Sequence, residues 1–381
     1  MSYILRATNE NIQPTPVGFY NFHTSPDEAL QYRLHLRVLP DENGILIVNA
    51  SSVLRLNRTG TYFAWQMMQN KTEEEIIQAA VKRYKAEEST IRADVQNFVD
   101  EVKFIITNPD QAPVFTESGF DNLSSDLGTK LPMRVNLCLT QRFSMGEVGK
   151  EMTELSTEQW KTLIQKTFNA GIPQIIFFGG EPTLRSDLLD LLGFAEELGL
   201  VTGLVTASAR LWQDQAYLEE LITNGLDHLV LEFDPEKNIP VAELETIFSQ
   251  DLFTCVRFPV HSWSQLFEWA MSLKNHGANA LSLYATELES HDVASHLIHQ
   301  LENKEIVIEY DLPSPLNADA PAEKSKLFSP ELEDHENEMY YSVLPDGSVC
   351  GQETPQIRLG NLSNAAWEQI LLKNSPLSEN K

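Results

Sequence analysis

The sequence predicts an α/β protein in three parts. These are a small N-terminal domain of three strands and three helices, a partial TIM-like barrel of six strand–helix units, and a small C-terminal hairpin region. Beyond residue 131, short apolar runs alternate with amphipathic helical segments, which is the pattern of a parallel sheet. Before residue 107, three short strands precede three helices. With 381 residues, the chain is long enough for two or three domains.

The charge of the chain limits its partners. It carries 28 Lys and Arg against 55 Asp and Glu, a net charge of −27. So acidic a protein is not expected to bind nucleic acid or an anionic membrane, because both interactions need positive charge on the protein. No apolar run reaches the roughly 18–20 residues of a membrane span, and the first residues lack the pattern of a signal peptide. We therefore expect a cytoplasmic protein.

The uneven distribution of charge indicates a domain boundary. Residues 1–112 carry 11 basic and 14 acidic residues, and residues 113–381 carry 17 and 41. The segment around this change has the Pro, Gly, Ser and Asp content of a linker. The chain is therefore predicted to divide into an N-terminal domain, a linker, a barrel and a C-terminal region, at residues 15–107, 108–130, 131–310 and 311–381.

The N-terminal domain is expected to be a β-meander followed by three helices. Its strands are three apolar runs separated by turn residues, at 31–39, 45–49 and 52–56. Asn57 is suited to cap the first helix, and Thr72 with Glu75 suits the capping box of the second. The third helix, from about Ser89 to Ile106, repeats apolar residues at helical spacing.

Residues 54–60, 72–77 and 94–99 of this domain read LRLNRTG, TEEEII and DVQNFV. With the strands before them, these phrases resemble the PqqD-like family, also called the RiPP recognition element. In that family a leader peptide adds as an extra strand to the sheet edge beside the third helix. The resemblance therefore implies a winged-helix-like, peptide-binding domain, and the alternative is a module that only packs on the second domain. The residues implied in peptide binding are Ser52, Val53, Leu54, Arg55 and Leu56, with Phe98 and Val102.

Six candidate barrel strands recur at the spacing of strand–helix units, at residues 134–140, 174–178, 201–206, 228–233, 253–260 and 280–286. In such folds, function lies at the carboxyl ends of the strands. Glycines there let the backbone approach a ligand closely, and a carboxylate accepts hydrogen bonds from an ammonium group. The candidate site residues at these ends are Gly179, Gly180, Glu181, Pro182, Thr206, Glu232 and Asp234.

The run from Leu137 to Leu211, with GGEPTL at 179–184, resembles the radical SAM superfamily and in particular its peptide-modifying branch. Residues 344–350 and 360–362 resemble the SPASM region of that branch. Family members hold a [4Fe–4S] cluster with three cysteines in the loop after the first barrel strand. They bind S-adenosylmethionine beside the glycine-rich segment. The resemblance implies the same fold and the same cleft for this chain.

The cluster loop departs from the family pattern. The three cysteine positions are occupied by Phe143, Glu147 and Lys150, whereas iron–sulfur clusters need thiolate ligands. The three cysteines of the chain lie elsewhere and far from one another in the sequence, at Cys138, Cys255 and Cys350. We therefore expect no [4Fe–4S] cluster and no other metal. S-adenosylmethionine in the GGEP cleft stays open as a cofactor, beside a purely structural turn and a different ligand.

Three kinds of function follow. The favoured hypothesis is a pseudoenzyme that binds a precursor peptide through its first domain and serves as a recognition or scaffold subunit. Its further partner would be an active modifying enzyme or a second copy of the chain. The second is an enzyme, either a radical SAM peptide-maturation enzyme with an unusual cluster site or a cluster-free enzyme. A cluster-free enzyme would use Glu181, Glu232, Asp234 or His261 as acid–base groups. The third is a plain interaction protein.

Overall fold

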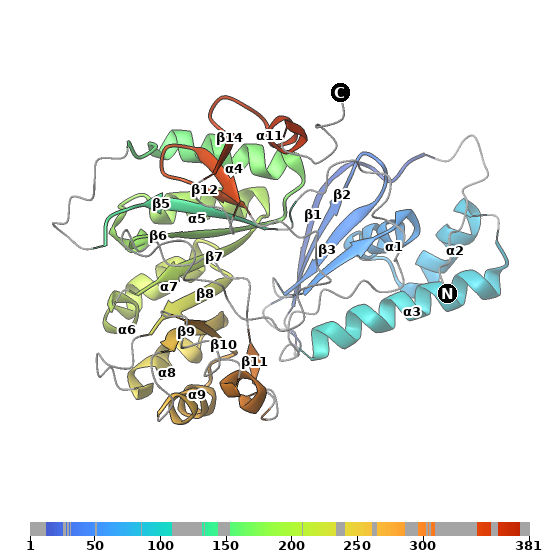
Figure 1. The fold of residues 1–381 in the computed structure, drawn as a ribbon. Helices are drawn as coiled ribbons and strands as arrows, with labels where there is room; N and C mark the ends of the chain where they lie inside the picture. The colour runs from blue at the N-terminus through green and yellow to red at the C-terminus, as the bar shows by residue number, and fades with distance from the viewer. Residues whose placement is uncertain are drawn as a thin grey trace. The chain divides into compact units, whose positions relative to one another are not determined.

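The computed structural model contains two compact units, Met1–Gly128 and Thr129–Lys381, which are described one at a time (Figure 1). Of the predicted linker 108–130, only Asn108 belongs to the described part of the chain. The structure describes residues 13–25, 28, 30, 32–49, 52–84, 86–108, 132, 134–143, 153–207, 209–233, 241–260, 265–285, 296–301, 304, 306–308, 341–351 and 357–373.

The first unit is a four-stranded antiparallel sheet with three helices packed on one face (Figure 1). The strands pair in chain order as β1 (Gly18–His23), β2 (Arg33–Val38), β3 (Gly44–Val48) and β4 (Ser52–Leu56). The helices are α1 (Arg58–Met68), α2 (Glu73–Arg83) and α3 (Glu88–Thr107). The edges of this sheet are therefore β1 and β4.

The prediction of three strands in this unit is wrong, because it omits β1. The sequence GFYNFH carries the alternating residues Tyr20 and Phe22, which pack against the core of this unit, but it also contains Gly and Asn, which are depleted in strands and weaken the signal. Its conformation comes from pairing with β2 along all six residues. The segment before it is fixed by Arg83, which donates to Gln13 O (2.6 Å) and forms an ion pair with Glu42 (2.9 Å).

The helices of the first unit begin where capping side chains allow it. The Asn57 carboxamide accepts hydrogen bonds from the backbone of Thr59 and Gly60, and Thr72 and Glu75 form a reciprocal capping box. Alternate strand residues then meet apolar helix residues in one core, because successive side chains of a strand point to opposite faces. The buried strand residues on this side are Leu34, Leu36, Val38, Leu46, Val48, Leu54 and Leu56.

The second unit contains a sheet with six parallel strands in chain order. They are β5 (Arg134–Thr140), β6 (Gln174–Gly179), β7 (Val201–Thr206), β8 (His228–Glu232), β9 (Phe253–Val260) and β10 (Ala280–Ala285). A short parallel strand, β11 (Val307–Ile308), follows β10. On the other side of β5 the sheet continues through β12 (Tyr341–Val343), β13 (Ser348–Gly351) and β14 (Arg358–Asn361).

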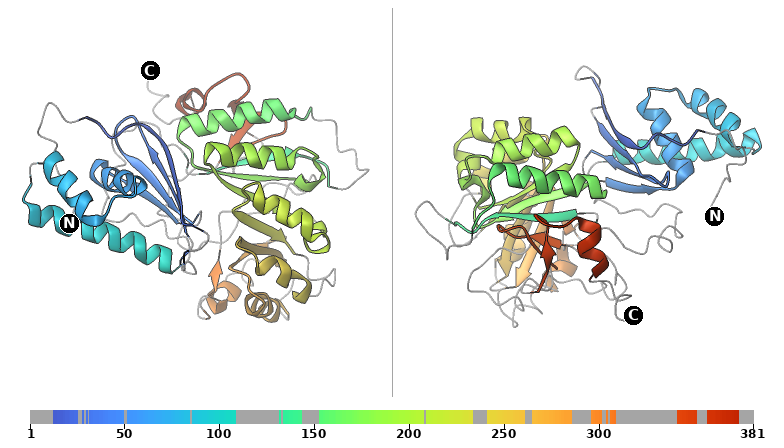
Figure 2. Two further views of the ribbon diagram at one scale, coloured as in Figure 1. Left: turned by 180° about the vertical axis from the view of Figure 1, so that it is seen from behind. Right: turned by 90° about the horizontal axis from the view of Figure 1, so that it is seen from above.

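The two faces of this sheet differ. One face packs against the helices in a large apolar core (Figure 2). The other face carries a smaller apolar cluster drawn almost entirely from the strands, which includes all three cysteines. The helical segments are α4 (Thr157–Ala170), η1 (Pro182–Leu184), α5 (Leu188–Leu198), α6 (Arg210–Gln213), α7 (Gln215–Thr223), η3 (Val241–Leu244), α8 (Glu245–Phe248), α9 (Leu266–Asn275) and α11 (Trp367–Lys373).

The C-terminal segment is part of the main sheet, because β12 pairs in parallel with β5. The buried Trp367 donates from its indole nitrogen to Thr167 Oγ1 (3.1 Å) on α4. Beside it, the Lys166 ammonium donates to the carbonyls of Leu362 (2.6 Å), Ser363 (3.3 Å) and Ala365 (3.2 Å). These bonds attach the turn before α11 to α4.

The structure confirms a mixed α/β protein with a parallel sheet. Closure of that sheet into a partial barrel and a winged-helix form of the first unit stay predictions. Among the helices that are described, none combines the length and apolar character needed to cross a bilayer.

Replacing Lys166 by Met should loosen the C-terminal segment, because three backbone carbonyls lose their donor. Each unsatisfied group that remains buried costs about 1–3 kcal/mol. Hydrogen exchange of residues 357–373 should therefore accelerate. Lys161→Met is the control on the same helix. Its ion pair with Asp190 (2.7 Å) involves a well-exposed carboxylate, so this variant should leave the exchange unchanged. Equal exchange in both variants would contradict this role of Lys166.

Candidate functional site

The chain turns sharply after β6 and runs against the chain that leaves β5. Gly180 N donates to Thr140 O (2.8 Å), and Glu181 N donates to Arg142 O (2.7 Å). A Cβ on Gly179 would collide with Thr140 O, and a Cβ on Gly180 would collide with Arg142 O. Gly179 also has φ of +142°, which L side chains rarely adopt. The close approach that requires these glycines is therefore made by the protein's own backbone.

This turn fixes the carboxylate of Glu181, whose residue is only 7% exposed. Oε1 accepts from Thr183 N (3.0 Å), from Thr183 Oγ1 (2.6 Å) and from Thr206 Oγ1 (2.7 Å) at the end of β7. Oε2 accepts from Ala207 N (3.0 Å). The structure thus brings two predicted site residues, Glu181 and Thr206, into contact. A carboxylate has about four acceptor positions, and Oε2 can accept one more donor.

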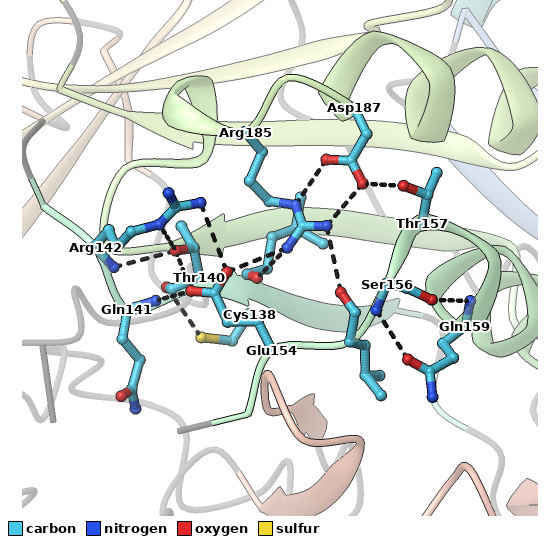
Figure 3. A network of polar contacts seen from close by, with 12 residues as sticks. Cys138, Thr140, Gln141, Arg142, Glu154, Ser156, Thr157, Gln159, Arg185 and Asp187 are labelled. Atoms are coloured by element: carbon cyan, nitrogen blue, oxygen red, sulfur yellow. Dashed lines mark hydrogen bonds and ion pairs between the residues drawn. The ribbon is translucent and has the colours of Figure 1, made fainter. Parts of the chain in front are cut away.

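A second polar network ties the two ends of the loop between β5 and α4 (Figure 3). Glu154 accepts from Thr140 Oγ1 (2.5 Å) and Gln141 N (3.3 Å), and it pairs with Arg142 (3.7 Å) and Arg185 (3.5 Å). Arg185 also donates to the Leu139 carbonyl (3.1 Å). The carboxylate of Glu154 and the guanidinium of Arg185 therefore hold the start and the end of this loop together.

Asp187 completes this network. Its carboxylate accepts from Arg185 (2.9 and 2.7 Å) and from Thr157 Oγ1 (2.6 Å), the first residue of α4. Burial acts to raise the pKa of Asp187, but the hydrogen bonds from Arg185 and Thr157 outweigh it and lower that pKa. Asp187 is therefore a stable anion that joins the turn after β6 to α4.

A charged pair lies between β8 and β9, which place Glu232 and Arg257 opposite each other. Arg257 Nη2 is 2.9 Å from Glu232 Oε1, and the two side chains are 1% and 17% exposed. Burial raises the pKa of Glu232, while Arg257 lowers it and Glu181 raises it further. The predicted residues Glu181 and Glu232 are thus electrostatic neighbours. Ser282 of β10 pairs with Arg257 in register and is completely buried.

The site residues predicted from the sequence do not include Arg257, Ser282, Arg185 and Glu154. One signal was available for Arg257, because an arginine inside the apolar run FTCVRFPV is rare unless a partner compensates its charge. No local pattern points to the other three, because a polar residue in a strand or loop is common and only the fold shows its neighbours.

In the first unit, the predicted peptide-binding strand 52–56 is β4, an edge of the sheet. Leu54 and Leu56 are buried in the core and Arg55 is exposed. Val53 pairs in register with Ile47. The structure places Phe98 and Val102 inside the core, at 8% and 0% exposure.

The predicted cluster positions are mostly beyond the described residues. Phe143 is described and 42% exposed, whereas Glu147 and Lys150 lie outside the described part, as do Asp234 and His261. The cysteines are buried at separate points on β5, β9 and β13. Burial raises the pKa of the Cys138 and Cys350 thiols, which are therefore protonated near neutral pH.

Comparisons with known proteins identify parts of this chain. Residues 40–103 match the family model "Coenzyme PQQ synthesis protein D (PqqD)". A PqqA peptide cyclase of Bradyrhizobium diazoefficiens is 33% identical over 111 residues, which are 27% of this chain and 29% of the relative. The chain therefore spans under a third of the curated relatives it matches.

Two crystal structures of Streptococcus suis SuiB share the fold. One is bound to S-adenosylmethionine, with a TM-score of 0.51 and 12% identity, covering 91% of this chain and 88% of SuiB. The other is bound to the precursor peptide SuiA, with a TM-score of 0.52, the same identity and the same coverage. The predicted resemblance is confirmed. The chain resembles the radical SAM peptide-modifying enzymes and carries a PqqD-like domain.

The comparisons also correct the expectation on cofactors. The similar SuiB structure is bound to S-adenosylmethionine, so the expectation that this chain has no cofactor is contradicted. The described residues nevertheless do not fit the family's three-thiolate donor set, because the three cysteines are buried on separate strands and Phe143 has no donor atom. For S-adenosylmethionine, Glu181 Oε2 offers an acceptor position for an ammonium group.

Gly179→Ala should destabilise the second unit by at least about 2 kcal/mol, because the added methyl group meets backbone atoms and the required φ is strained. Gly193→Ala is a matched control within α5. The nearest atom to its new Cβ is Asn224 Oδ1 at 3.4 Å, so this variant should be neutral or stabilising by about 0.5–1 kcal/mol. Urea denaturation measures both effects. Similar midpoints would show that the turn after β6 tolerates a side chain.

Glu232 should make stability depend on pH. Its folded pKa is raised by burial, so the folded state holds this proton more tightly than the unfolded state does. Stability should therefore fall as pH rises from about 4.5 through the raised pKa, and be constant above it. Glu232→Gln should remove this slope, because the amide keeps a neutral side chain of similar shape at every pH. Parallel stability curves for both proteins between pH 4 and 8 would disprove this.

Proposed function

We propose that this chain binds a precursor peptide through its first unit and acts in the modification of that peptide. The main observation behind this proposal is that β4 is an edge strand and lies inside residues 40–103, which match the PqqD model. A strand edge offers a row of backbone donors and acceptors, which is what an extended peptide needs for β-strand addition. The SuiB structure bound to its precursor peptide SuiA supports this proposal.

Within this function, the chain serves as a recognition or scaffold subunit. The first unit is then a winged-helix-like domain that holds the leader, and the second is a partial barrel that supports the rest of the peptide or a partner. That partner is an active modifying enzyme or a second copy of the chain. Glu181, Glu154 and Arg185 already form hydrogen bonds within the protein. These bonds support a structural role for the turns around β5 and β6.

The second candidate is a radical SAM peptide-maturation enzyme, in line with the PqqA peptide cyclase and the S-adenosylmethionine-bound SuiB. Iron and sulfide content after anaerobic reconstitution separates the candidates. About four irons per chain, with turnover of S-adenosylmethionine, identifies an enzyme. Peptide binding without such turnover identifies the recognition role.

Peptide binding should protect β4 from hydrogen exchange. The probe is a set of peptides selected by the full-length chain from a random 20-residue library, since any extended peptide that adds to an edge shields its amides. We expect slower exchange within residues 52–56 and unchanged exchange within α2. Protection confined to β1, or to the second unit, would refute the proposed role of β4.

A further inference from the structure

The sheet of the first unit has an unusual distribution of charge. Its four strands contain three arginines, Arg33, Arg37 and Arg55, and neither Asp nor Glu. The whole protein, by contrast, carries a net charge of −27. In this acidic protein, the formally charged residues of this one sheet are all positive. Positive charge of this kind favours a negatively charged partner.

The three arginines lie on one face of the sheet. Arg37 is paired with Ile45, and Ile45 is paired with Arg55, so these side chains form a row across three strands. The neighbouring row, Leu36, Leu46 and Leu54, points to the opposite face and into the core. The strands are thus apolar toward the helices, and their other face carries the arginines beside the buried residues His35, Ile45 and Ile47.

The last member of the row is available for a ligand. Arg55 is exposed, and within the described residues its side chain makes neither an ion pair nor a hydrogen bond. Arg37 is more buried, and burial lowers its pKa to about 10, so it still carries a full charge near pH 7. Between them, Ile45 is 8% exposed. The positive charge of the row therefore reaches the open edge at Arg55.

A fifth strand on this edge would extend the row. Side chains directly opposite each other on paired strands have Cβ atoms about 4.5–5.5 Å apart, where opposite charges stabilise and like charges destabilise. The residue opposite Arg55 on the added strand would lie on the same face as Arg55, and its two neighbours would point to the side of Leu54 and Leu56.

We propose that the peptide strand added to β4 carries Asp or Glu opposite Arg55, with apolar residues on either side of it. This inference rests on the proposed function and names the chemistry of the peptide. Its basis is the row Arg37–Ile45–Arg55, which ends in an exposed guanidinium at the open edge of the sheet. An acidic segment would be repelled by most of the protein surface, so this face also orients the peptide.

The test is a charge exchange. The full-length protein and its Arg55→Glu variant each select peptides from the same random 20-residue library. The protein should enrich peptides with Asp or Glu between apolar residues, and the variant should enrich Lys or Arg at that position. Substituting Lys for the acidic residue of a selected peptide should weaken binding to the unmodified protein about three- to tenfold. The weakening should shrink at high salt.

Lys82→Glu is the control, because it makes the same charge change on an exposed position of α2, away from the sheet. It should select the same peptides as the unmodified protein. Peptides that protect β4 from exchange but show no charge preference, or none that depends on residue 55, would overturn this inference and leave the proposed function intact. Peptides that fail to protect β4 at all would overturn the proposed function itself.

Discussion

The approach of the chain after β6 to the chain after β5 is the constraint on which the second unit's site depends. Two backbone hydrogen bonds, from Gly180 to Thr140 and from Glu181 to Arg142, bring the two segments together. Only residues without a Cβ fit at positions 179 and 180. This contact places Glu181 where Thr206 and Ala207 can bind its carboxylate. The ends of β5, β6 and β7 are therefore connected by one turn.

The same region contains charges that are largely compensated inside the protein. Arg185 is shared by Glu154, Asp187 and two segments of backbone, and Arg257 is paired with Glu232. Buried ion pairs of this kind fix geometry more than they add stability, because desolvation of the charges offsets much of their attraction. The contacts of Arg185 and Glu154 hold the loop ends around β5 in place. The C-terminal segment adds to this rigidity, since β12 occupies the free side of β5.

The first unit has the opposite character. Its sheet ends in the edge strand β4, which carries the exposed Arg55. An edge strand without a partner is normally shielded, because it invites unwanted pairing. An arginine at such an edge both discourages association with a second identical edge and favours an anionic strand. The match of residues 40–103 to the PqqD model coincides with this part of the structure.

The sequence by itself determined the elements whose signal is local. The six parallel strands follow from hydrophobic periodicity, the capping box at Thr72 from capping chemistry, and the turn after β6 from its paired glycines. Only the tertiary structure decided that β1 joins the first sheet and that β12 pairs with β5. It also decided that Arg257 meets Glu232 and that Arg185 meets Glu154. The pairs β12–β5, Arg257–Glu232 and Arg185–Glu154 join separate elements of the chain, and such pairing depends on the assembled core, which local propensity does not encode.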